Sequence, residues 1–290
     1  MTSPTRLQPP LPAVVRACLP RPPRSAAFLL ALAFLLAPLR LPAAPAASPL
    51  LEAWQSLAVS SSREARRLFQ TAASNAPDSR PAALGLALSS LGFSSFDATR
   101  LEEIRAQLTA LADGNDAAAR AALYFLGRIA QLYARPADPA LAAQYYRQLI
   151  ARGLDDYWSR NAVVKLALLE LFSLPQPGGR EARLARAELL LADTTDALAR
   201  RDLHLVLAEV LLRWHASDER ALSHLEAAEQ IGGLDDTTRA DVLVQIGELA
   251  RLRGDTLTAR RHYDLFLREY PRERRTYFVR QRRDSLAPTR

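Results

Sequence analysis

From residue 48 onward, apolar side chains recur every three or four positions, and short polar stretches interrupt them. This spacing predicts amphipathic helices throughout, because it places the apolar residues on one face of a 3.6-residue turn. Gly114, Gly153 and Gly233 stand where a left-handed residue would end a helix, and Asp or Thr follows within a few positions to cap the next one. The pattern therefore predicts an all-α chain of short, well-separated helices.

The apolar pattern also repeats at a longer interval. Alternate predicted helices carry apolar residues at i, i+4 and i+7: Ala65/Phe69/Ala72, Ile104/Leu108/Leu111, Ala142/Tyr146/Leu149, Ala185/Leu189/Ala192, Ala221/Leu225/Ala228 and Ala259/Tyr263/Phe266. The first members lie 39, 38, 43, 36 and 38 residues apart, and "GLDD" occurs twice, 80 residues apart. A period in this range is typical of repeats built from a pair of helices.

Residues 241–271 resemble a tetratricopeptide repeat (TPR). The positions that carry the resemblance are Ile246, Gly247, Gly254, Asp255, Ala259, Tyr263, Phe266 and Pro271. In this interpretation, Gly247 and Ala259 let the two helices cross closely, while Tyr263 and Phe266 fill the seam with the next pair. The resemblance is closest at 241–271 and diffuse over 50–240. It implies an α-solenoid of about six hairpins over residues 47–271, with an irregular all-α bundle as the alternative.

The TPR resemblance also implies a function, which is the binding of a protein or peptide in a groove lined by the first helix of each pair. The residues placed there by the resemblance are Asp241, Val244, Glu248 and Arg251 in the last repeat, and Tyr124, Arg128 and Gln131 in residues 119–149. Some TPR domains hold a C-terminal carboxylate with Lys and Asn at such positions. Because Asp241, Val244 and Glu248 stand there instead, that activity is not expected here.

Composition and charge narrow the class of partner. Hydrophobic residues make up 49% of the chain and charged residues 24%, which is too apolar for a disordered protein. The formal net charge is +7, but residues 1–46 hold five Arg and no acidic residue, and residues 272–290 hold seven Arg and two acidic residues. The body between them is slightly acidic, so no nucleic-acid partner is expected.

The N-terminus has the pattern of an export signal. Four arginines precede a 14-residue apolar run at 26–39, and Ala44-Pro45-Ala46 supplies small residues for cleavage. This arrangement predicts a secretory signal peptide over 1–46 and a periplasmic or secreted chain that begins at Ala47. An uncleaved signal-anchor that tethers the chain to the membrane is the alternative. Since Cys18 is the only cysteine, the cleaved chain would contain no disulfide and no thiolate ligand.

We find no sequence pattern for catalysis or for a cofactor. The chain lacks the usual phosphate-loop, nucleophile-elbow and zinc-helix motifs. His204 and His215 lie about three helical turns apart, or about 16 Å, which is too far to share one metal ion. Asp155-Asp156 and Asp235-Asp236 are interpreted as helix caps. We therefore predict a non-enzymatic protein without a cofactor or a metal.

The last segment, residues 272–290, is predicted to form a capping helix that covers the end of the array. In this prediction Tyr277 and Phe278 cover the apolar seam while arginines face water. A further function is docking of Arg280, Arg282 and Arg283 on anionic lipid or an acidic protein.

The sequence thus predicts an exported protein-binding scaffold. The alternative is a helical accessory module of an envelope enzyme complex that contacts wall polymer or anionic lipid.

Overall fold

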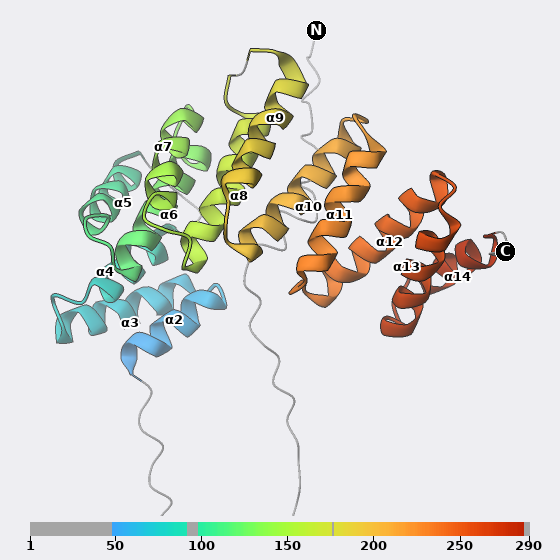
Figure 1. The fold of residues 1–290 in the computed structure, drawn as a ribbon. Helices are drawn as coiled ribbons and strands as arrows, with labels where there is room; N and C mark the ends of the chain where they lie inside the picture. Colours follow the sequence, from blue (N-terminus) through green and yellow to red (C-terminus); the bar gives the residue numbers. More distant parts are fainter. Residues whose placement is uncertain (1–47, 92–97, 176, 287–290) are drawn as a thin grey trace, which may run out of the picture. The chain divides into compact units, whose positions relative to one another are not determined.

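The computed structural model describes residues 48–91, 98–175 and 177–286, so the predicted signal peptide lies outside the described residues. The described residues contain thirteen α-helices and no strand, which confirms the predicted all-α class. They fall into two compact units that divide within helix α7, between Tyr145 and Tyr146. We call the described residues between 48 and 145 the N-terminal unit and those between 146 and 286 the C-terminal unit (Figure 1).

The N-terminal unit consists of helices that stack in chain order. They are α2 (Pro49–Ala58), α3 (Ser62–Asn75), α4 (Arg80–Leu91), α5 (Ala98–Leu111), α6 (Ala117–Leu132) and the beginning of α7 (Pro139–Ile150). From α2 to α6 each helix packs on the next, and α4 also contacts both α2 and α6. Such nearest-neighbour packing, with the first helices of successive pairs side by side, is the arrangement of an α-solenoid.

The C-terminal unit repeats this arrangement. It contains α8 (Tyr157–Phe172), α9 (Gly179–Asp193), α10 (Ala197–Arg213), α11 (Asp218–Ile231), α12 (Asp236–Leu252), α13 (Thr256–Glu269) and α14 (Thr276–Asp284). Each helix packs on its successor, and α8 also contacts α10. The described helices thus follow one another as six consecutive pairs, α2/α3 to α12/α13, and then α14, at the spacing that the sequence predicts.

The helix ends form largely as the sequence predicts. Asp156 accepts hydrogen bonds from the backbone N–H groups of Trp158 and Ser159, and Asp235 accepts them from Thr237 and Thr238. Gly114, Gly153 and Gly233 have φ of 99°, 108° and 69°. In that left-handed region a side chain would be strained. Gly233 directly follows the C-cap of α11, whereas Gly114 and Gly153 lie three residues beyond the last residue of α5 and α7, in the turns that follow. The two acidic pairs therefore include helix caps.

Two glycines allow a close approach between helices. Tyr263 of α13 is fully buried, and its ring lies so close to Gly247 of α12 that a Cβ atom on Gly247 would overlap it. Gly85 of α4 makes the same contact with the buried ring of Phe69 in α3. An aromatic ring against a helical glycine thus occurs in both units, once within a hairpin and once between successive hairpins.

One predicted helix face is wrong. On α9 the expected triplet Ala185/Leu189/Ala192 is exposed, and the buried residues are Leu184, Ala187 and Leu191. The sequence carries two overlapping apolar stripes here, because leucines occupy 189, 190 and 191 in succession. Local periodicity does not choose between them. The contacts that α9 makes with α8 and α10 select the stripe that is one residue earlier.

The terminal helix α14 forms and packs on α13, but not through the residues expected. Tyr277 is 78% exposed and Phe278 is 39% exposed, whereas Val279 and Leu286 are buried in the core shared with α13. Val279 lies within α14 and Leu286 two residues beyond its end, and both reach the same core. Tyr277 precedes Val279 by two positions, which turns its side chain toward the opposite face.

Candidate functional site

The first helices of the C-terminal unit carry acidic residues at equivalent positions. Helices α10 and α12 begin 39 residues apart. Asp202 and Glu209 of α10 precede Asp241 and Glu248 of α12 by the same 39 residues. Because each pair is separated by seven residues, its members lie on one side of their helix. We call these four residues the acidic face.

Each carboxylate of the acidic face has an arginine beside it. Arg275, at the beginning of α14, pairs with Asp241 at 2.7 Å, and Arg282 of α14 lies 3.7 Å from Glu248. Within α10, Arg213 pairs with Glu209 at 3.0 Å. Two residues predicted to line the groove, Asp241 and Glu248, are therefore engaged by the terminal helix.

Glu248 has the most contacts of this group. It accepts a hydrogen bond from the Tyr263 hydroxyl at 2.6 Å and another from Arg251 at 2.9 Å. Burial raises the pKa of Glu248, but these hydrogen bonds outweigh the burial and leave that pKa below its ordinary value. Burial and the nearby Glu248 carboxylate together raise the pKa of Tyr263. Glu248 is thus an ionised acceptor that ties α12 to α13.

The structure places the other predicted groove residues differently. Val244 is only 8% exposed and packs in the core with Tyr263 and Val279, so its assignment to the groove is wrong. The reason is that α13, together with Val279 and Leu286, packs over this side of α12. In the N-terminal unit, Tyr124 is buried, with 9% of its surface exposed. Arg128 donates a hydrogen bond to the side chain of Gln131 at 3.4 Å, and both of these residues are partly exposed.

Asp202 and Glu209 were not found from the sequence. They could have been identified from the repeat, because they lie 39 residues before Asp241 and Glu248. Asp202 pairs with Arg201 of the same helix. Burial raises the pKa of Asp202, and the charge of Arg201 opposes this effect.

Of the three arginines predicted to dock on anionic surfaces, two have partners within the fold. Arg282 lies near Glu248 and over the Phe278 ring, 4.9 Å from its centre. Arg283 pairs with Asp264 at 3.2 Å and with Asp284 at 2.7 Å. Arg280, the third of these arginines, is exposed.

A histidine pair joins α10 to α11. Nδ1 of His204 lies 2.8 Å from Nδ1 of His224, so one ring donates a proton and the other accepts it. His215, which shares the helix of His204 in the sequence interpretation, instead ends α10 with a φ of 52°. The partner of His204 lies 20 residues further along the chain, on the next helix.

We expect acid to destabilise this contact. Burial, then the charges of His224 and Arg200, lower the pKa of His204 to about 4, and burial also lowers the pKa of His224. Between pH 6.5, where a histidine of the unfolded chain titrates, and pH 4, the unfolded state binds more protons. The stabilising contribution is therefore present above pH 6.5 and is lost as the pH falls to 4. The difference between the two pKa values is equivalent to about 3 kcal/mol, and solvent around the partly exposed ring reduces this to about 2 kcal/mol.

Urea denaturation at pH 7, 5.5 and 4.5 measures this effect. His204→Gln should flatten the pH dependence of the unfolding free energy, while the control His215→Gln should leave it unchanged, because His215 is exposed. Parallel pH profiles for the wild type and His204→Gln would contradict the assignment.

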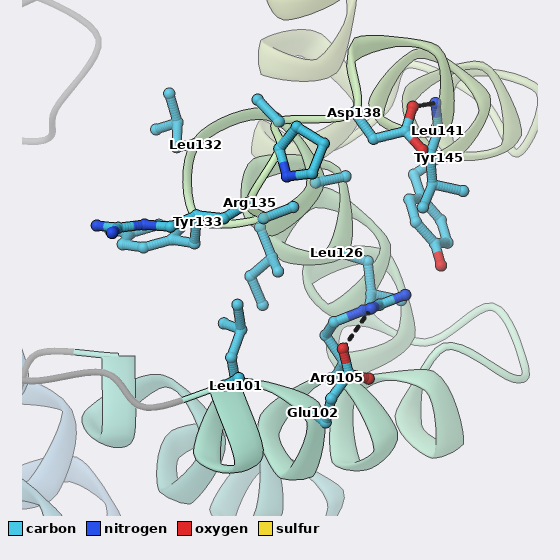
Figure 2. A pocket seen from close by; sticks show the side chains of 16 residues that line it. Leu101, Glu102, Arg105, Leu126, Leu132, Tyr133, Arg135, Asp138, Leu141 and Tyr145 are labelled. Carbon is cyan, nitrogen blue, oxygen red and sulfur yellow. Dashed lines mark hydrogen bonds and ion pairs between the residues drawn. The ribbon is translucent and has the colours of Figure 1, made fainter.

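The N-terminal unit contains a pocket of about 640 Å³ (Figure 2). Its lining comes from α5, from the C-terminal half of α6, from the turn at 133–138 and from the first residues of α7. Buried Leu126, Ile129 and Ala130 of α6 contribute the interior, while Leu132 and Tyr133 are exposed at 53% and 38%. Figure 2 shows Leu101 of α5 facing the open space from the side opposite the turn.

Two structural observations bear on chemistry and membranes. Among the described residues, no three His, Cys, Asp or Glu side chains are placed to share a metal ion. In the same part of the chain, no helix has the length and apolar character needed to span a bilayer.

Comparisons with known proteins yield matches to solved structures. No protein-family model matches the chain, and no curated protein does. One similar structure is the crystal structure of the APC/C hetero-tetramer Cut9-Hcn1, at 17% identity and a TM-score of 0.41, covering 83% of this chain and 42% of that one. Another is the TPR domain of P58(IPK), at 17% identity and a TM-score of 0.29, covering 81% of this chain and 64% of that one.

This chain spans less than two thirds of the length of either matched structure. The helix pairs of this chain, their period and the glycine–aromatic contacts define an all-α protein built from repeated helix pairs.

Proposed function

We propose that this protein is a non-catalytic scaffold that binds a partner protein on the first-helix side of its C-terminal unit. The observation that carries the proposal is the acidic face, where carboxylates recur at the same positions of α10 and α12. Charged side chains are unfavourable at positions that face the core. Glu209 and Asp241 instead keep about a third of their side chains exposed, where a partner could reach them. Such a row is complementary to a basic or mixed-charge segment of a partner.

We propose further that the scaffold acts outside the cytoplasm, which rests on the pattern of residues 1–46 and not on the fold. Affinity purification from the envelope fraction of producing cells, with the full chain as bait, tests both proposals. The recovered bait should begin at Ala47. Recovery of full-length chain from the cytosol alone would contradict export.

Charge reversal locates the binding surface. Glu209→Lys on α10 should weaken binding of the purified partner about tenfold or more, because it places a cation in the acidic face. The matched control is Glu226→Lys on α11, where an exposed carboxylate undergoes the same charge change.

We expect the control to bind as the wild type does. Equal loss in both variants, or no loss in either, would contradict the proposed surface. Retention of wall polymer or lipid in place of a protein would favour the accessory-module alternative.

A further inference from the structure

The pocket of the N-terminal unit owes its shape to the turn between α6 and α7. Six residues, 133–138, separate these helices, whereas three residues separate α12 from α13. The turn contributes every one of its residues to the pocket lining. Its length is the feature that the sequence shows as an insertion relative to a TPR hairpin.

The walls of the pocket are mainly apolar. They comprise Leu101, Leu126, Ile129, Leu141 and the rings of Tyr133 and Tyr145, along with smaller residues. Leu132 and Tyr133 stay exposed beside this space, although burying such apolar side chains would be favourable. The pocket and its rim thus form a continuous apolar surface that a ligand could cover.

The charged residues of the pocket lining differ in whether they have a partner within the protein. Arg105 pairs with Glu102 at 2.7 Å, as the dashed line in Figure 2 shows. The Asp138 carboxylate accepts the backbone N–H of Leu141 at 2.8 Å, in the first turn of α7, where a helix favours negative charge. Arg135, on the turn, is exposed and has no ion pair with the other described lining residues. Of the two arginines in the lining, Arg135 is therefore the one that can pair with an acidic ligand group.

We propose that this pocket binds an anionic amphiphile, a molecule with an apolar body and a single acidic head group. The apolar body packs against the α6 side chains Leu126 and Ile129, and the head group lies at the turn beside Arg135. The volume of about 640 Å³ falls in the range of sites that hold small organic ligands, which are mostly apolar with a few polar groups at defined places. The single uncompensated cation gives the site its preference for an anion.

Dodecanoate is a suitable probe, and dodecanol is its uncharged counterpart. Displacement of 1-anilinonaphthalene-8-sulfonate fluorescence, with each compound below its aggregation concentration, measures both affinities on the full chain. We expect dodecanoate to bind about tenfold more tightly than dodecanol, since a hydrogen bond to a charged group adds to the apolar contact. Arg135→Gln should remove this difference, while Arg63→Gln, at an exposed arginine of α3, should preserve it.

A second variant blocks the pocket. Ala137 is exposed and lines the space, so Ala137→Trp should fill it without disturbing the core. We expect this variant to lose dodecanoate binding, whereas Ala140→Trp, exposed on α7 outside the lining, should retain it. Circular dichroism establishes that both variants are folded.

Three results would overturn the proposal: no binding of dodecanoate to the wild type, undiminished binding to Ala137→Trp, or equal affinities for dodecanoate and dodecanol. The dodecanoate test does not depend on whether the C-terminal unit binds a partner protein. Failure of the pocket test therefore leaves the proposed scaffold function standing, and the reverse also holds.

Discussion

Tyr263→Ala is expected to destabilise the C-terminal unit by about 3–5 kcal/mol, the usual cost of removing a fully buried aromatic side chain. Tyr263 has no exposed surface, and its ring fills the space left by Gly247 in α12. Truncation would leave a cavity there and would also remove the hydroxyl that donates to Glu248 at 2.6 Å. Urea denaturation followed by circular dichroism measures the loss.

Two companion variants separate the causes. Tyr263→Phe keeps the ring and should cost only about 1 kcal/mol, the net value of one hydrogen bond. Gly247→Ala should be costly in the wild type, because its methyl group overlaps the ring, and much less costly in Tyr263→Ala. If the two substitutions were simply additive, the close approach between α12 and α13 would not be as described.

Gly85→Val is expected to destabilise the N-terminal unit by about 3 kcal/mol, at the upper end of the range for overpacked cores. A Cβ atom on Gly85 would overlap the Phe69 ring, which is fully buried and in edge contact with Trp54 at 4.9 Å between centres. The ring therefore cannot move aside without disturbing a second aromatic residue.

Ala83→Val on the same helix is the matched control for Gly85→Val, because Ala83 is partly exposed and the substitution adds the same β-branched side chain. Thermal unfolding of the two variants should differ clearly, with Gly85→Val lower. Similar melting temperatures would contradict the contact with Phe69, because helix propensity alone favours Val over Gly and disfavours Val relative to Ala.

The missed site residues show where single-sequence reasoning stops. His204 meets His224 because α10 and α11 pack as a hairpin, and no local pattern relates residues 20 positions apart. Arg282 was expected in solvent, yet α14 lies so that this side chain approaches Glu248 of α12. In both cases the partner is set by how helices are placed around one another. That placement depends on the summed packing of many side chains.

The sequence by itself determined the helices, their ends and their pairing. These features depend on interactions within a few residues: the 3.6-residue apolar period, the capping carboxylates of Asp156 and Asp235, and the left-handed glycines. The close contact at Gly247 was also predicted, because only a missing side chain permits it.

The tertiary structure alone decided which of two apolar stripes α9 buries, that Val279 and not Tyr277 anchors α14, and that the turn at 133–138 opens a pocket. Each of these outcomes is a choice between locally equivalent faces or conformations. The choice is made by contacts with neighbouring helices, because a face is buried only where another helix covers it.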